Sequence, residues 1–244
     1  PMTSNTELER ISLQDLKKLV EEAKEWTLKL VLIGGYAVRA YTKPRRFTKD
    51  LDFVTIREDL GQMKGFLRYM NYEYKSGEFW LSGSKKLNET WIDLHMSIDK
   101  VHDITTGYDY PVTPNFFRNS QKRKITTYFE ENSYLSLQAQ ICPIEDLLIM
   151  KLIPLRDKDL VDVIALILDS HDQITPSRLY QIIHEANLRP HINSRLTTLF
   201  LQTKRKERIN RTWRNITGTE YRISHSEITS LKKRIKKLME TIAK

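Results

Sequence analysis

The sequence contains one cysteine and no long apolar run. Cys142 cannot form an internal disulfide by itself, which is typical of proteins from a reducing compartment. A membrane-spanning helix needs about 20 consecutive apolar residues, and residues 2–5 do not begin a signal peptide. Internal repeats and Gly/Ser linkers are also missing. We therefore expect a cytoplasmic globular protein with no membrane association, in which Cys142 is a small buried side chain.

Basic residues are in excess and unevenly distributed. The 244 residues include 40 Lys and Arg against 31 Asp and Glu, a net charge of +9. From Lys204 to the C-terminus there are 13 basic and 4 acidic residues, so the rest of the chain is electrically balanced. Charge concentrated in this way indicates a polyanionic or an acidic partner.

The hydrophobic pattern changes near Pro143. Before it, short apolar segments alternate with helical ones, and after it apolar residues recur at helical spacing. We predict an α/β (α+β) domain over residues 1–142 and a helical domain with a basic C-terminal helix over residues 143–244. Strands are expected at residues 28–33, 72–75, 79–82, 90–96, 125–129 and 134–137. Helices are expected at residues 12–26, 36–41, 58–70, 143–153, 158–169, 176–187, 190–206 and 224–242. Turns are expected at Gly77, Gly83 and residues 130–132, and a basic loop at residues 121–124.

A glycine pair and two closely spaced aspartates carry the strongest functional signal. Gly34 and Gly35 follow an apolar strand and open a short helix, whose free N–H groups attract anions. Asp50 and Asp52 are separated by one residue in the next strand, so their side chains project from one face. Two neighbouring carboxylates repel each other unless a cation lies between them, and Mg²⁺ or Mn²⁺ suits carboxylate and phosphate oxygens. The arrangement predicts a divalent metal and a nucleoside triphosphate in one place.

These motifs resemble the signature of the DNA polymerase beta superfamily of nucleotidyltransferases. The longer strings, GGYAVRA over residues 34–40 and RFTKDLD over residues 46–52, are similar to the AbiEii-like branch, the toxins of type IV toxin–antitoxin systems. That branch has a second motif, a lysine followed by an arginine and Asp-x-x-Asp, which appears as KLIPLRDKDLVD over residues 151–162. The resemblance covers about residues 30–170. It implies a minimal nucleotidyltransferase fold, a mixed sheet backed by helices, joined to a C-terminal helical domain.

The same resemblance implies roles for the residues around the glycine pair. Gly34 and Gly35 would let the triphosphate lie against backbone amides. In the commoner superfamily form a serine follows the first glycine, but here Gly35 occupies that position. The phosphate contacts would then come from the backbone and from cations, with Tyr36 or Thr48 as candidate substitutes for the missing hydroxyl.

Asp93 is the best candidate for a third metal ligand. It is a lone acid in the apolar strand predicted over residues 90–96, and such strands rarely bury an unpaired charge. The superfamily places its third acid on a neighbouring strand in this way. His95 would share the face of Asp93, either in the site or as a hydrogen-bonded packing residue.

The second motif implies contacts to the triphosphate. Lys151 and Arg156 would stabilise charge that develops on phosphorus in the transition state. Asp159 and Asp162 lie three residues apart on one side of a helix, where either would orient these cations or act as a base. The alternative is an ordinary charged helix surface with internal salt bridges.

The basic C-terminal region predicts contacts to RNA phosphates. Apolar residues 231, 235, 238 and 242 form one stripe of the final helix, which leaves its basic residues on the opposite face. Trp213 lies between two arginines, where an aromatic ring can stack on a base. The alternative is a solvated surface on a packing helix. The candidate RNA contacts are Lys204, Arg205, Arg211, Arg214, Lys232, Lys233 and Lys236.

Together these residues predict a metal-dependent enzyme that transfers a nucleoside monophosphate from an NTP to a hydroxyl group. The resemblance and the basic C-terminus favour an RNA 3′ end as acceptor, with tRNA first, and toxicity through blocked translation. Two alternatives stay open. The acceptor is a hydroxyl group of a protein, such as a cognate antitoxin, or the chain is a non-catalytic member that binds a nucleotide or a partner.

Overall fold

The computed structural model describes residues 5–43, 46–130, 133–218 and 222–243. The chain divides into two compact units, each described here by itself. The α/β unit comprises Pro1–Ala40, Phe47–His102 and Pro111–Pro143. The helical unit comprises Tyr41–Arg46, Asp103–Tyr110 and Ile144–Lys244. Two early segments therefore belong to the helical unit, so a single sequence boundary does not describe this division.

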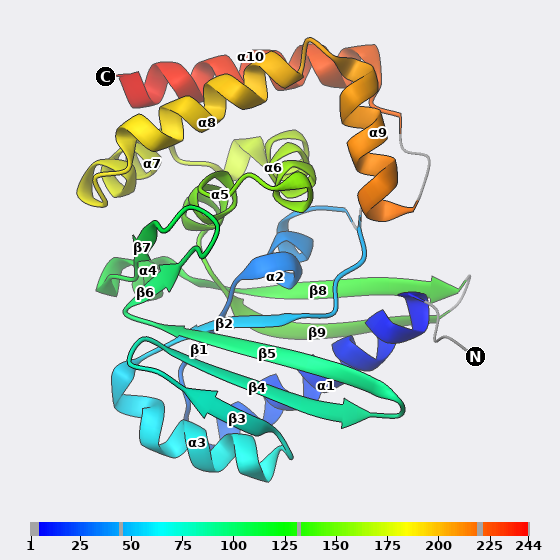
Figure 1. Ribbon diagram of the computed structural model, residues 1–244, viewed down its shortest axis with the longest axis vertical. Coiled ribbons are helices and arrows are strands. Elements are labelled where there is room, and N and C mark those ends of the chain that lie inside the picture. The colour runs from blue at the N-terminus through cyan, green and yellow to red at the C-terminus, as the bar shows by residue number, and fades with distance from the viewer. Residues whose placement is uncertain (1–4, 44–45, 131–132, 219–221, 244) are drawn as a thin grey trace. The chain divides into compact units, whose positions relative to one another are not determined.

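The α/β unit is built on a mixed sheet, as predicted (Figure 1). Its main strand order is β3-β4-β5-β2-β1-β9-β8. The pairings β1–β9 and β2–β5 are parallel, and β1–β2, β3–β4, β4–β5 and β8–β9 are antiparallel. The strands are β1 (Leu30–Leu32), β2 (Leu51–Thr55), β3 (Glu73–Ser76), β4 (Trp80–Leu87), β5 (Thr90–Ile98), β6 (Lys100–His102), β7 (Asp109–Pro111), β8 (Gln121–Glu130) and β9 (Ser133–Ile141).

Helices α1 (Asn5–Glu25) and α3 (Leu60–Tyr69) cover one face of this sheet (Figure 1). Helix α1 buries Leu13, Leu16 and Leu19 completely, because its apolar residues recur at helical spacing. A buried ion pair joins α1 to β4, where Lys85 Nζ contacts the Asp15 carboxylate, which also accepts a hydrogen bond from the Tyr72 hydroxyl. Helix α2 (Gly34–Tyr41), the 3₁₀ turn η1 (Arg57–Asp59) and α4 (Pro114–Asn119) complete the α/β elements.

The helical unit contains the elements that follow β9. They are α5 (Ile144–Leu152), α6 (Asp157–Asp169), η2 (His171–Gln173), α7 (Pro176–Glu185), α8 (Arg189–Gln202), α9 (Lys206–Thr217) and α10 (His225–Ala243). Helix α10 begins with a capping box, since the Glu227 backbone N–H donates to Ser224 Oγ at 3.1 Å and the Ser224 N–H donates to the Glu227 carboxylate at 2.7 Å. The predicted apolar stripe is also confirmed: Leu231, Ile235, Leu238 and Ile242 are all buried.

Several predicted elements were wrong in detail. The first helix begins at Asn5 rather than Ser12, whose hydroxyl donates instead to the carbonyl of Lys49. Gly83 lies inside β4 and not in a turn. Glycine suits this position because a Cβ there would lie 3.1 Å from the Tyr72 ring. The turn is formed by Asn88 and Glu89, both with positive φ, as two-residue hairpins require.

Other differences arise where charge or proline masked the pattern. The basic residues 121–124 are the start of strand β8 and not a loop. Helices α4 and α9 were not predicted. Helix α5 ends at Leu152, just before Pro154, and α6 begins at Asp157, so Pro154 lies between two separate helices. The predicted turn at residues 130–132 falls largely outside the described residues. Cys142 is fully buried, as expected.

No helix in the described part of the chain is both long enough and apolar enough to cross a membrane.

Candidate active site

The predicted carboxylates lie where β2 and β5 run side by side. Asp50 directly precedes β2 and Asp52 is its second residue. Leu51 and Phe53, which point to the opposite face, are buried, so the predicted alternation is confirmed. The parallel register of β2 and β5 places His95 beside Asp52.

One cavity of about 640 Å³ is lined by Asp50, Asp52, Asp93 and His95. Asp93 is exposed on this face, so the strand does not bury its charge, and its role as a third metal ligand stays a prediction. Partial burial lowers the pKa of His95, and the nearby Asp52 carboxylate opposes that shift. Among the described residues, no group of three or more His, Cys, Asp or Glu side chains has a metal-binding arrangement.

Gly34 is required by both its backbone and its surroundings. Its φ is +70°, in the left-handed region where glycine avoids the strain of a Cβ. A Cβ at this position would lie 2.9 Å from both Cβ and Cγ of Asp52, closer than such atoms approach. The absence of a side chain at Gly34 therefore lets α2 begin directly against the Asp52 carboxylate.

We expect Gly34→Ala to abolish most of the nucleotidyl transfer that the resemblance implies, because it displaces Asp52. The substitution should also lower the free energy of unfolding by about 1–3 kcal/mol. Gly107→Ala is the matched control, because Gly107 has a φ of +74° and a Cβ added there would have no atom within 4 Å. Steady-state rates and urea midpoints of both variants separate backbone strain from the clash. Equal losses in the two variants would contradict the contact with Asp52 as the cause.

The two hydroxyl groups proposed to replace the superfamily serine are buried. Tyr36 has no exposed surface, and its hydroxyl donates to Ser12 Oγ at 3.0 Å and is 3.1 Å from the Thr48 carbonyl oxygen. Burial raises the pKa of Tyr36 well above its usual range. The prediction that Tyr36 contacts phosphate is therefore corrected: it anchors α2 to α1. Thr48 is also buried, whereas Gly34 and Gly35 are half-buried at the start of α2.

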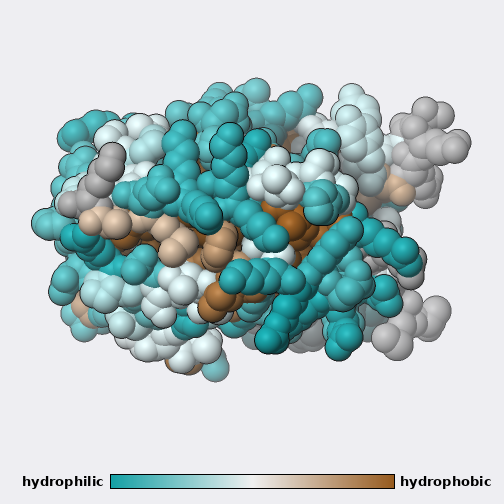
Figure 2. Space-filling model, turned by 90° about the horizontal axis from the view of Figure 1, so that it is seen from above, coloured by the Kyte–Doolittle hydropathy of each residue, from teal (hydrophilic) through white to brown (hydrophobic). Residues whose placement is uncertain are grey.

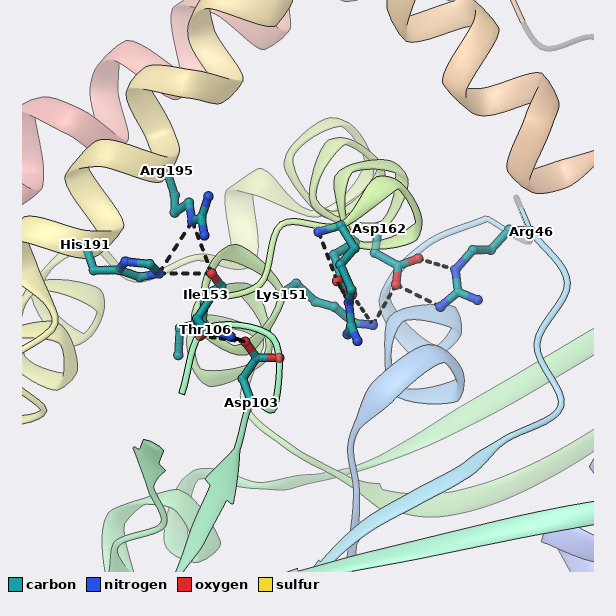
Figure 3. Close-up of polar contacts among 10 residues, drawn as sticks. Arg46, Asp103, Thr106, Lys151, Ile153, Asp162, His191 and Arg195 are labelled. Carbon is teal, nitrogen blue, oxygen red and sulfur yellow. Dashed lines mark hydrogen bonds and ion pairs between the residues drawn. The ribbon is translucent and has the colours of Figure 1, made fainter. Parts of the chain in front are cut away.

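The second motif forms a buried charge cluster in the helical unit (Figure 3). Lys151 Nζ lies 2.8 Å from an Asp162 oxygen and 3.3 Å from Asp159 Oδ1. Arg46 donates two hydrogen bonds to Asp162, from Nε at 2.6 Å and from Nη2 at 2.8 Å. Arg156 Nε donates to Asp159 at 2.7 Å. The internal salt bridges of the alternative interpretation are therefore present, but they are not on an ordinary helix surface, since both carboxylates are almost completely buried.

The cluster shifts the pKa values of its central pair. Burial acts to lower the pKa of Lys151, but the Asp162 and Asp159 carboxylates outweigh it and raise that pKa above the ordinary 10.5. Burial acts to raise the pKa of Asp162, but Lys151 and Arg46 outweigh it and hold that pKa below the ordinary 3.8. Both groups are therefore charged at neutral pH.

These shifts predict how the stability of the helical unit depends on pH. The Asp162 contribution is present above pH 3.8 and is lost as the pH falls through the lowered folded-state pKa. The Lys151 contribution is present below pH 10.5 and is lost as the pH rises through the raised folded-state pKa. Urea midpoints measured from acid to alkaline pH should fall at both ends, and should fall less steeply in a Lys151→Met, Asp162→Leu double variant.

These contacts distinguish between the two roles considered for the aspartates. Asp159 and Asp162 hold Lys151, Arg46 and Arg156, which matches an orienting role and leaves no exposed carboxylate to act as a base. Arg46 was missing from the predicted site, although it belongs to the RFTKDLD string. Arg156 has a side chain that is 46% exposed, against 10% for Lys151.

The basic C-terminal residues are on the surface, with one correction. Lys204, Arg205, Arg211, Arg214, Lys233 and Lys236 are exposed and Lys232 is half-buried. Trp213 is 1% exposed, so the prediction that it stacks on a base is wrong. Figure 2 looks onto α8 and α10, where hydrophilic side chains predominate and hydrophobic atoms show between them.

Three arginines gather in a cleft between α6 and α9. The cleft has a volume of about 480 Å³ and is lined by Arg205, Arg208 and Arg211 together with Asp157 and Leu160. Arg208 was not predicted individually, although its place in the basic run beginning at Lys204 was a usable signal. The cleft offers guanidinium groups to a phosphate-bearing ligand.

A helix that begins at Gly34 against Asp52, with Asp93 on the strand paired with β2, is the arrangement that the resemblance to nucleotide-transferring enzymes implies. A family model described as "Nucleotidyltransferase of unknown function (DUF6036)" matches residues 8–214, and the chain belongs to this family. The protein is therefore a nucleotidyltransferase. The DNA polymerase beta superfamily prediction is supported, whereas the family description does not name the AbiEii-like branch. No curated protein matches the sequence significantly.

Two solved structures from H. pylori share the fold. A proposed nucleotidyltransferase is 12% identical, with a TM-score of 0.55 over 96% of each chain. JHP933 from Helicobacter pylori is also 12% identical, with a TM-score of 0.54 over 100% of this chain and 95% of that chain. At this identity the likeness shows the fold, and the α/β architecture with additional helices is confirmed.

Proposed function

We propose that the protein transfers a nucleoside monophosphate from an NTP to the 3′ hydroxyl of an RNA, in a magnesium-dependent reaction. The observation that carries the proposal is the cavity shared by Asp50, Asp52 and Asp93, against which α2 begins at Gly34. The acceptor oxygen forms a bond to the α-phosphorus, the bond to the β-phosphate oxygen breaks, and pyrophosphate leaves. The hydroxyl proton passes to Asp93.

The donor set suits magnesium. Mg²⁺ prefers hard oxygen ligands and is commonly held by one or two carboxylates plus substrate phosphates and water. Asp50 and Asp52 would provide the two carboxylates, and Asp93 would join them as a third ligand when substrate is bound. Manganese suits the same oxygens. The ion supplies charge neutralisation at the transferring phosphoryl group. The backbone at Gly34 and Gly35 approaches the phosphates closely because no side chain intervenes.

The second motif contributes positive charge. Of the two cations that the resemblance assigns to the triphosphate, Arg156 has the more exposed side chain, so we assign it the phosphate contact. Lys151 is assigned a positioning role, because it neutralises the buried Asp159 and Asp162 that hold Arg156 and Arg46. Arg156 stabilises negative charge that increases in the transition state.

RNA is the acceptor that the surface charge favours. The arginine cleft on α9 and the exposed lysines of α10 place the excess charge where phosphates can be neutralised. A single-stranded 3′ end, such as that of tRNA, carries both the phosphates and the free hydroxyl. The likeness of the RFTKDLD and KLIPLRDKDLVD strings to AbiEii-like toxins supports a toxin that is neutralised by a cognate antitoxin.

The test is to incubate the protein with magnesium, total tRNA and each α-phosphate-labelled NTP in turn. We expect label in RNA, dependent on magnesium and on one preferred NTP. Label in protein would replace RNA with a protein hydroxyl as acceptor. Absence of label, together with absence of metal-dependent NTP binding by calorimetry, would indicate a non-catalytic member and overturn the proposal.

A further inference from the structure

Two exposed tryptophans lie on the open face of the sheet, on β4 and β5. In both strands alternate side chains are buried on the α1–α3 side, while the others face away from it. Trp80 is 40% exposed and Trp91 is 50% exposed. An aromatic side chain of this kind buries about 150–250 Å² when it is packed. Two partly exposed indoles on one face are candidates for stacking contacts with a ligand.

This face is continuous with the candidate active site. Asp52 is in register with His95 on β5, and His95 is in register with Ser82 on β4. Two residues along β5, Asp93 is in register with Ser84. All five side chains line the cavity described above. A ligand lying along β4 and β5 on this face would therefore extend to Asp52 on β2.

The tryptophans bracket the polar part of this face. Trp80 precedes Ser82 by two residues, and its ring lies 18° from parallel to the His95 ring, with centroids 6.5 Å apart. Trp91 precedes Asp93 by two residues and is in register with Lys86 at the far end of β4. The six residue steps from Trp80 to Lys86 span about 20 Å at the rise of a β-strand. Several unpaired bases fit along that length.

Gly77 makes room for the first of these rings. A Cβ at Gly77 would lie 2.7 Å from Cε2 of Trp80, so another residue there would push the indole aside. The position of the ring on the open face thus depends on a glycine in the β3–β4 turn.

The charge on this face shows which part of a nucleic acid it suits. Asp50, Asp52, Asp93 and Glu73 line the cavity with a single lysine, Lys75. Where no cation neutralises them, these carboxylates repel phosphates but not the uncharged faces of bases, which stack on aromatic rings in a sequence-tolerant way. Serine hydroxyls between the rings both donate and accept hydrogen bonds.

We propose that the tryptophan face, comprising Trp80, Ser82, Ser84, Trp91 and His95, binds unpaired bases at the 3′ end of the acceptor RNA. Stacking on Trp80 and Trp91 holds the terminal nucleotide so that its 3′ hydroxyl lies beside Asp52. The inference rests on the proposed function and names the part of the acceptor that this face recognises. It predicts a preference for unpaired ends over blunt duplex ends, with little dependence on base sequence.

The test uses two probes with the same number of phosphates: a single-stranded oligoribonucleotide of mixed sequence and its abasic analogue. We expect Trp80→Ala and Trp91→Ala each to weaken binding of the first probe roughly 10-fold or more, the usual effect of losing one stacked base. Trp91→Phe should retain most of the affinity, because a smaller ring still stacks. The abasic probe should bind weakly to wild type and be unaffected by these substitutions.

Tyr69→Ala is the matched control, since Tyr69 is 55% exposed on α3, which covers the opposite face of the sheet. It should leave both affinities unchanged. Equal binding of the base-containing probe by wild type and both alanine variants would overturn the tryptophan face, as would equal weakening of the abasic probe. If wild type labels RNA and the variants label it equally well, the tryptophan face fails while the proposed function stands. If wild type labels protein instead, both the proposed RNA acceptor and the tryptophan face are overturned.

Discussion

Asp52→Asn is expected to lower kcat/KM by about 10²–10³-fold, the loss seen when one transition-state contact is removed. The amide keeps the size of the side chain but removes the negative charge that would hold the metal. Its half-buried position on the open face and the relief of repulsion with Asp50 mean that the fold should be retained. Labelled-NTP transfer measures the rate, and thermal unfolding measures the fold.

A second readout separates lost chemistry from lost binding. With Mg²⁺ and NTP present, the wild-type Tm should rise with ligand concentration, because ligand binding to the folded state stabilises it. The Asp52→Asn variant should lose most of that rise. Asp99→Asn is the control carboxylate, since Asp99 pairs with Arg57 on the surface and is not among the residues lining the cavity. Full activity in Asp52→Asn would show that the metal site is assigned to the wrong residues.

Asp162→Asn is expected to destabilise the helical unit by about 3–5 kcal/mol, the cost of leaving a buried charge without its partner. The Asp162 side chain is 3% exposed and contacts both Lys151 Nζ and the Arg46 guanidinium. An asparagine would leave two cations facing a neutral amide in a water-poor environment. The urea midpoint followed by circular dichroism measures the loss.

Combining the substitution with Lys151→Met gives the sharper test. With Lys151 removed as well, one cation, Arg46, faces the amide instead of two, so the double variant should lose less stability than the sum of the two single losses. Asp172→Asn, at an exposed aspartate of the same unit, should change stability by less than about 0.5 kcal/mol. Additive losses in the double variant would mean that Lys151 and Asp162 act independently, against the observed contact.

The local features of the site could be predicted because they depend on neighbours in the chain. Alternation in a strand placed Asp50 and Asp52 on one face, with Leu51 and Phe53 in the core. The strand of Asp93 was also recognisable from its apolar residues. The sequence did not show that Tyr36 is buried, because its hydroxyl is satisfied by Ser12, which is 24 residues away. It did not predict Arg46 as a partner of Asp162, which is 116 residues away.

The sequence by itself determined which functional groups are available: two carboxylates on one strand face, a glycine pair, a lysine–arginine–aspartate motif and a basic C-terminus. The reason is that strand and helix periodicities fix which neighbouring residues share a face. The tertiary structure decided which of these groups are exposed. Strand register placed His95 beside Asp52 and put both tryptophans on the open face, whereas Trp213 and Asp159 became buried. Burial depends on contacts between distant segments, and those contacts determine whether a charge or a ring meets a ligand or another part of the chain.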